Sequence, residues 1–163
     1  MVKKTIQKNI KTQPRKDRLS WDECFMRIAH VIADRSLDPS TQTGAVIVND
    51  QNVVVGMGYN GWPRGIKSED LPWDRDGDLE NTKYAYVVHS EENAIYNANG
   101  STKGCKIYST LFPCNECAKA IIQNGIKEVI YESDKYADLP AYKASKKMLK
   151  LAKVLTRQYK RKS

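Results

Sequence analysis

Two short stretches of the chain carry side chains that bind metals and move protons. Glu91 lies two residues after His89. Cys114 and Cys117 lie three residues apart, directly after Pro113. One imidazole and two thiolates are ligands that zinc prefers, and three protein ligands leave a fourth position for water, as in catalytic zinc sites. Glu91 would lie beside the metal without binding it, where it could act as a general base toward that water.

The spacing of the two cysteines suits the beginning of a helix. Proline fits the first helical position, so Pro113 is expected to begin a helix whose first turn carries both thiols on one face. The positive end of the helix dipole lowers thiol pKa values. A structural zinc site is the alternative, but it would need a fourth ligand and has no use for a free carboxylate such as Glu91. A second zinc site would need additional histidine and cysteine ligands. Because the chain has only two histidines, we expect one zinc ion per chain.

Alternating helices and strands are expected to position these residues. The predicted elements are a helix over 20–32, a hairpin of strands over 43–48 and 53–56, a helix over 90–98, a strand over 105–111, a helix over 113–125, a strand over 128–132, a helix from 140 and an edge strand at 154–155. The second half forms a parallel βαβ arrangement, in which ligands bind beyond the carboxyl ends of the strands. Lys135 follows a strand at this edge and could meet an anionic part of a substrate.

Residues 62–88, which we call the insertion, show no sustained periodicity. Loops of this length in a compact domain are usually functional or disordered. The insertion contains aromatic residues, which argue against disorder: Trp62, Trp73, Tyr84 and Tyr86. We therefore expect it to form a packed lid or rim.

Charge is concentrated at the two ends of the chain. Of the total +8, residues 1–18 carry +6 and residues 157–163 carry +4, which leaves −2 for the body. We expect a basic flexible arm over 1–18, one domain over 19–156 and a basic tail over 157–163. A slightly acidic body argues against a nucleic-acid partner. No apolar run approaches 18 residues and the lysine-rich start lacks a signal-peptide core, so we expect a cytoplasmic protein without a membrane partner, in the host cytoplasm if the chain is viral.

Over roughly residues 20–156 the chain resembles the deoxycytidylate (dCMP) deaminase family. The H-x-E and P-C-x-x-C stretches mark zinc nucleobase deaminases. The G-Y-N-G stretch at 58–61, the insertion and the D-K-Y stretch at 134–136 narrow the resemblance to the deaminases that act on dCMP. The matching stretches are residues 38–45, 58–63, 89–95, 113–119 and 133–136. The resemblance implies a three-layer α/β fold of the cytidine-deaminase type, with a five-stranded mixed sheet flanked by helices. It also implies a homohexamer that hydrolyses dCMP to dUMP and ammonia for thymidylate synthesis.

The same resemblance implies roles for further residues. The zinc ligands would be His89, Cys114 and Cys117, with Glu91 as the catalytic proton carrier. Activation by dCTP and inhibition by dTTP are implied, with a nucleotide effector bound at Gly58, Tyr59, Asn60 and Gly61. A nucleotide substrate needs a cation at the mouth of its pocket, for which Lys135 and Arg35 are available. Asn60 and Tyr136 complete the candidate substrate-binding residues.

Two other classes of function remain open from the sequence. One is another zinc deaminase, acting on cytosine or cytidine, on a riboflavin precursor or on adenosine in tRNA. A tRNA enzyme should have a basic body, which this chain lacks. The other is a zinc-stabilised nucleic-acid-binding module that uses the basic ends, and the carboxylate of Glu91 argues against it.

Overall fold

The structure is a computed structural model that describes residues 12–161. Most of the predicted arm, residues 1–11, and the last two residues of the tail, 162–163, lie outside the described residues. No helix within the described range is long and apolar enough to cross a membrane.

A mixed five-stranded sheet forms the middle layer of the domain. Its strands, in the order β2-β1-β3-β4-β5, are β1 (Gly44–Val48), β2 (Val54–Tyr59), β3 (Lys106–Leu111), β4 (Glu128–Ser133) and β5 (Leu155–Gln158). The strand β1 pairs antiparallel with β2 and β3, whereas β3, β4 and β5 run parallel. The predicted hairpin and the predicted parallel βαβ arrangement are both confirmed.

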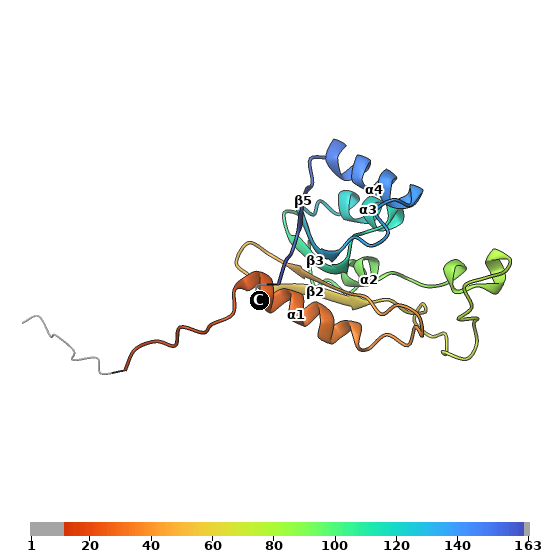
Figure 1. Ribbon diagram of the computed structural model, residues 1–163, viewed down its shortest axis with the longest axis horizontal. Coiled ribbons are helices and arrows are strands. Elements are labelled where there is room, and N and C mark those ends of the chain that lie inside the picture. The colour runs from red at the N-terminus through yellow and green to blue at the C-terminus, as the bar shows by residue number, and fades with distance from the viewer. Residues whose placement is uncertain (1–11, 162–163) are drawn as a thin grey trace, which may run out of the picture.

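Helices cover both faces of this sheet (Figure 1). They are α1 (Trp21–Ala33), α2 (Ser90–Tyr96), α3 (Asn115–Gln123) and α4 (Pro140–Leu151). Alternate residues of β1 point to opposite faces, so Ala45 and Ile47 pack with α2, α3 and α4, whereas Val46 and Val48 pack with α1. Both faces are buried, which explains the continuous apolar run of β1. The three-layer α/β fold is therefore as expected.

Two glycines let helices contact the sheet through its backbone. A Cβ atom on Gly44 would lie 1.9 Å from the carbonyl oxygen of Ala29 in α1. A Cβ atom on Gly58 would lie 2.3 Å from the backbone nitrogen of Ala94 in α2. The missing side chain of Gly58 thus places α2 directly against β2.

The C-terminal strand extends beyond its predicted end. We expected an edge strand at 154–155 and a tail from residue 157, but β5 continues to Gln158. Arg157 donates hydrogen bonds of 2.7 Å to both carboxylate oxygens of Asp22 in α1 and one of 2.8 Å to Glu128 in β4. Arg157 and Gln158 therefore belong to the folded domain, because their strand pairs with β4. The other domain boundaries remain predictions.

Candidate active site

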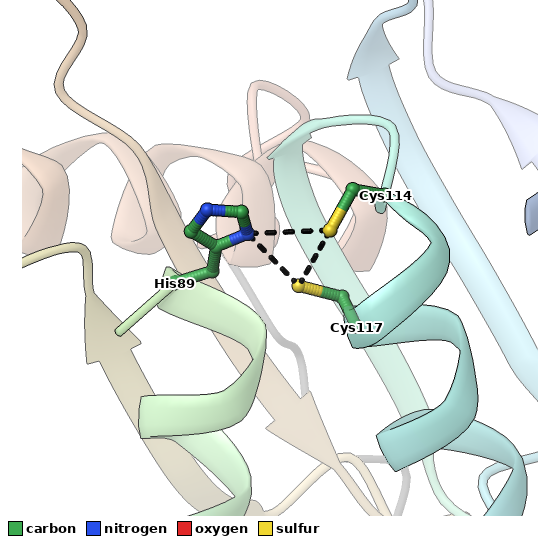
Figure 2. Close-up of side chains that lie close together, drawn as sticks. All are labelled: His89, Cys114 and Cys117. Carbon is green, nitrogen blue, oxygen red and sulfur yellow. Dashed lines mark hydrogen bonds between the residues drawn. The ribbon is translucent and has the colours of Figure 1, made fainter. Parts of the chain in front are cut away.

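His89, Cys114 and Cys117 converge where α2 and α3 begin (Figure 2). His89 is the N-cap of α2 and Cys114 is the N-cap of α3, so the latter helix begins two residues later than predicted. The Nδ1 atom of His89 lies 3.4 Å from Cys114 Sγ and 3.3 Å from Cys117 Sγ, and the two sulfurs are 3.7 Å apart. Zinc bonds of 2.0–2.3 Å at tetrahedral angles give ligand separations of roughly 3.5–3.8 Å. The cluster could therefore hold one zinc ion.

The protonation of the cluster also suits a cation. The hydrogen bond with Cys117, together with that from His89, lowers the pKa of Cys114 to about 4. The interaction with Cys114 raises the pKa of His89 to about 9, and the same sulfur together with burial raises the pKa of Cys117. The three groups thus share protons around one thiolate. A divalent cation would displace these protons, since it binds thiolates and neutral imidazole.

Glu91 lies beside the cluster in a buried position. Its side chain accepts hydrogen bonds from Ser90 Oγ at 3.0 Å and from Ser109 Oγ at 3.3 Å. The Oε2 atom lies 3.6 Å from Cys117 Sγ, and burial raises the pKa of the carboxyl group. A buried carboxyl with a raised pKa can both accept and donate a proton. Glu91 therefore stands where a proton carrier is needed without joining the three candidate ligands.

A cavity of about 400 Å³, which we call the catalytic cavity, opens above His89, Glu91 and Cys114. Its volume lies in the range typical of small-molecule sites. Phe112 and Tyr142 contribute aromatic surface to its lining, and other lining residues are polar. We call the part formed by His89, Glu91 and Cys114 the floor of the cavity. The cavity thus combines aromatic surface with an ionisable floor.

The insertion forms part of the mouth of this cavity. Arg75 and Tyr84 line it, and Arg75 Nε donates a hydrogen bond of 3.2 Å to the Tyr84 hydroxyl. Tyr136 also lines the cavity, and the exposed Lys135 places its Nζ atom 5.0 Å from the centre of the Tyr136 ring. The two cations at or beside the mouth could meet an anionic group.

The predicted substrate-binding residues do not all reach the catalytic cavity. Asn60 and Tyr136 line it, the exposed Lys135 lies beside Tyr136 but is not part of the lining, and Arg35 lines a different cavity. Asn60 accepts a hydrogen bond from the Thr43 backbone and donates to the Thr41 carbonyl, so its amide supports the loop between them.

Sequence reasoning missed several residues of this cavity. They include Asp38, Thr41, Arg75, Lys83, Phe112 and Tyr142. The aromatic content of the insertion indicated a rim, but no periodic pattern shows which of its residues point inward. Asp38 lies in a turn-forming sequence, so the sequence indicated a turn residue and not a residue of the cavity.

A second cavity of about 340 Å³, which we call the arginine cavity, contains Arg35 and Arg64. Its wall includes Trp62 and Trp73, whose rings stack with centres 3.9 Å apart. Of the four predicted effector residues, Tyr59 and Gly61 line this cavity. The other two do not: Gly58 packs against α2, and Asn60 faces the catalytic cavity.

The fold and the cluster are those of a zinc-dependent nucleobase deaminase. The model of the cytidine and deoxycytidylate deaminase zinc-binding region matches residues 19–133. The chain therefore belongs to the cytidine and deoxycytidylate deaminase family, in agreement with the resemblance noted in the sequence. The zinc cofactor expected from the sequence agrees with this family and with the ligand cluster.

Among individual proteins, the chain is similar to animal deoxycytidylate deaminases. The Mus musculus enzyme is 52% identical over 153 residues, which cover 93% of this chain and 86% of the mouse protein. The Homo sapiens enzyme is 49% identical over 152 residues, which cover 92% of this chain and 85% of the human protein. The crystal structure of dCMP deaminase from the cyanophage S-TIM5 in complex with dCMP and dUMP superposes with a TM-score of 0.69 at 24% identity, covering 84% of this chain and 95% of that chain. This last likeness shows the fold.

Proposed function

We propose that the protein hydrolyses dCMP to dUMP and ammonia and so supplies dUMP for thymidylate synthesis. The observation that carries this proposal is the buried Glu91 beside the His89, Cys114 and Cys117 cluster at the floor of a nucleotide-sized cavity. The substrate is suggested by relatives named deoxycytidylate deaminase that are about half identical over most of the chain.

The chemistry follows from the floor of the catalytic cavity. Zinc held by the three ligands would activate a water molecule for attack at C4 of cytosine. Glu91 accepts the first proton of that water and delivers it to N3 of the base; it then accepts the second proton from the hydroxyl now at C4 and delivers it to the amino group, which leaves as ammonia. The hydroxyls of Ser90 and Ser109 hold the carboxylate in place for these transfers. Phe112 and Tyr142 exclude water from the base.

The mouth of the cavity suits the 5′-phosphate of the substrate. With cytosine at the floor, the phosphate lies near Arg75 and Tyr84 of the insertion, and near Tyr136. Lys135 adds positive charge at the rim. Asn60 acts by holding the loop that carries Thr41 and Thr43 along one wall. Arg35 is left out of this assignment because it lines the arginine cavity.

We infer further that the arginine cavity binds a nucleotide effector, with dCTP as activator and dTTP as inhibitor. Arg35 and Arg64 supply charge for phosphates, and Tyr59, Trp62 and Trp73 supply aromatic surface. The family resemblance further suggests a homohexamer. We place the protein in the cytoplasm, because its proposed substrate is a free nucleotide. Light scattering with and without dCTP tests the assembly.

One assay tests the proposed reaction directly. Ammonia release is measured in parallel from dCMP, CMP, deoxycytidine and cytosine, with zinc content determined on the same sample and with dCTP present or absent. We expect dCMP to have the highest kcat/KM. A preparation with one zinc per chain that leaves dCMP unchanged but deaminates a riboflavin precursor or tRNA adenosine would assign the chain to another branch of the zinc deaminases.

A further inference from the structure

A buried ion pair joins the insertion to the loop that follows α1. The Nζ atom of Lys83 donates hydrogen bonds of 2.7 Å and 2.6 Å to the two carboxylate oxygens of Asp38. Lys83 is 5% exposed and Asp38 is 3% exposed. Among the ion pairs within residues 12–161, only this one has both side chains buried.

Stability alone does not account for two charges in this position. A buried ion pair loses the hydration of both groups, and replacing such a pair by apolar residues of similar size is often neutral or stabilising. The carboxylate of the pair nevertheless accepts several further hydrogen bonds. Asp38 also accepts from the backbone N–H groups of Ser40 and Thr41 at 2.8 Å and 3.1 Å, and from Asn60 Nδ2 at 3.3 Å. The Asp38 carboxylate therefore has a defined orientation, and it can hold the Lys83 ammonium in a defined place.

The two sides of the pair carry different parts of the catalytic cavity. On the side of Asp38, the loop brings Thr41 to the wall. On the side of Lys83, the next residue is Tyr84, and the Lys83 backbone N–H donates a hydrogen bond of 2.9 Å to the carbonyl oxygen of Asp74. Asp74 directly precedes Arg75. One ion pair thus connects the wall of the cavity to both Tyr84 and Arg75 at its mouth.

The floor of the cavity is held by a different set of contacts. His89, Glu91 and the two cysteines are held by the beginnings of α2 and α3, and by Ser109 of β3. We propose that the Lys83–Asp38 pair positions the insertion over the catalytic cavity and thereby sets the preference for a substrate with a 5′-phosphate. This inference rests on the proposed deamination of dCMP. Both residues also line the cavity, but the ammonium and the carboxylate are hydrogen-bonded to each other, so we treat Lys83 and Asp38 as positioning residues, and the reacting atoms lie at the floor.

The test compares substrates with and without the phosphate. The variants are Lys83→Met, which keeps the aliphatic stem, Asp38→Asn, which keeps the acceptor for the backbone N–H groups, and the double variant of both. The double variant leaves no unpaired buried charge, so it should recover most of the thermal stability that either single variant loses. Lys67→Met removes an exposed charge from the same insertion and serves as the matched control.

We expect the single and double variants to raise KM for dCMP at least tenfold, while kcat changes less than threefold. The kcat/KM for deoxycytidine should stay within threefold of wild type, zinc should remain at one per chain, and Lys67→Met should match wild type. Lys83→Arg should restore part of the affinity for dCMP, because it restores the charge. A folded double variant with wild-type KM for dCMP overturns the proposal, as does an equal loss on both substrates.

Hydrogen exchange provides a readout that does not depend on activity. Peptides covering residues 74–86 should lose protection in the double variant, whereas peptides of α2 and α3 should keep it. Unchanged protection of residues 74–86 would also overturn the proposal. The outcomes separate the two levels of inference: a wild-type protein inactive on dCMP refutes the proposed function, while active variants with unchanged KM refute only the role of the pair.

Discussion

The floor and the mouth of the catalytic cavity are supported by different kinds of structure. At the floor, two helix starts are held by β3 and by the direct contact of α2 with Gly58. At the mouth, the insertion contains two short 3₁₀ turns, Leu79–Asn81 and Lys83–Ala85, and a single β-bridge from Val88 to Gly61, and it extends to the right of the sheet in Figure 1. Regular elements thus carry the groups that react, and an irregular segment carries groups suited to recognition. Substitutions at the two places should therefore fail in different ways.

The largest effect is expected from removing a metal ligand at the floor. Cys117→Ala should lose zinc, turnover and stability together, because metal binding contributes to the free energy of folding. A loss of about 3 kcal/mol would lower the melting temperature by roughly 6–12 °C. Zinc content, calorimetry and ammonia release measure the three effects. Cys24→Ala, which removes a free thiol of α1, is the control and should keep the metal. Full zinc occupancy in Cys117→Ala would show that the ligand set is wrong.

Glu91→Gln should separate chemistry from metal binding at the floor. The substitution removes the proton carrier but no ligand, so we expect normal zinc content and a fall in kcat of about 10²–10⁴-fold. The neighbouring Glu92→Gln is the matched control and should change kcat less than threefold. If Glu91→Gln retains more than a tenth of wild-type turnover with dCMP, another group carries the proton.

A smaller and selective effect is expected at the mouth. Arg75→Ala should lower kcat/KM for dCMP roughly tenfold, because it removes a charge-assisted contact to the phosphate. Deoxycytidine, which has no phosphate, should be turned over equally by wild type and variant. Steady-state kinetics on the two substrates measure the difference. An equal loss of kcat/KM on dCMP and deoxycytidine would show that Arg75 does not act through the phosphate, and would contradict separate roles for the floor and the mouth.

Lys135→Ala should have a weaker effect than Arg75→Ala. Lys135 is exposed and lies beside the cavity, so water and salt screen its charge. We expect a loss of roughly threefold in kcat/KM for dCMP at low ionic strength, and almost none in 0.5 M salt. The salt dependence distinguishes a screened charge from a direct contact: a loss that persists at high salt would place Lys135 against the phosphate.

The smallest effect is expected from the N-terminal arm. Removal of residues 1–16 should leave kcat and KM for dCMP nearly unchanged, because this segment carries charge but none of the proposed site residues. Light scattering is needed beside the kinetics. A monodisperse truncated protein with reduced turnover would indicate that the arm reaches an active site.

The sequence was most informative about the floor. The spacing of His89 and Glu91, and that of the two cysteines, is local in the chain, and each stretch lies where a predicted strand or loop meets a helix. The predicted elements also agree with the observed ones to within a few residues. Details of packing are harder to predict: Trp21 in α1 is large and apolar but is 57% exposed, whereas Met26 in the same helix is 1% exposed. Helical spacing defines a face and not its exact centre.

The mouth could not be predicted because it depends on contacts between distant residues. Lys83 and Asp38 are 45 positions apart, and neither has a neighbour in the sequence that indicates the other. Arg35 follows α1 closely, but the turn after the helix directs it to the arginine cavity, and no periodic pattern reports the direction of a turn. Arg157 was assigned to a tail because of its charge, although its strand pairs with β4.

The position of the metal ligands also has a consequence for folding. His89 and Cys114 are 25 residues apart, and the segment between them contains β3, the central strand of the sheet. A zinc ion bound by both residues would close a loop of this length. For comparison, a covalent link that closes a loop of this size contributes roughly 3–4 kcal/mol to the free energy of unfolding by restricting the unfolded chain. The zinc link also shortens the search by which β3 finds its partners, since loop closure limits the formation of distant contacts. The residues proposed to activate water would therefore also bring the middle of the sheet together while the chain folds.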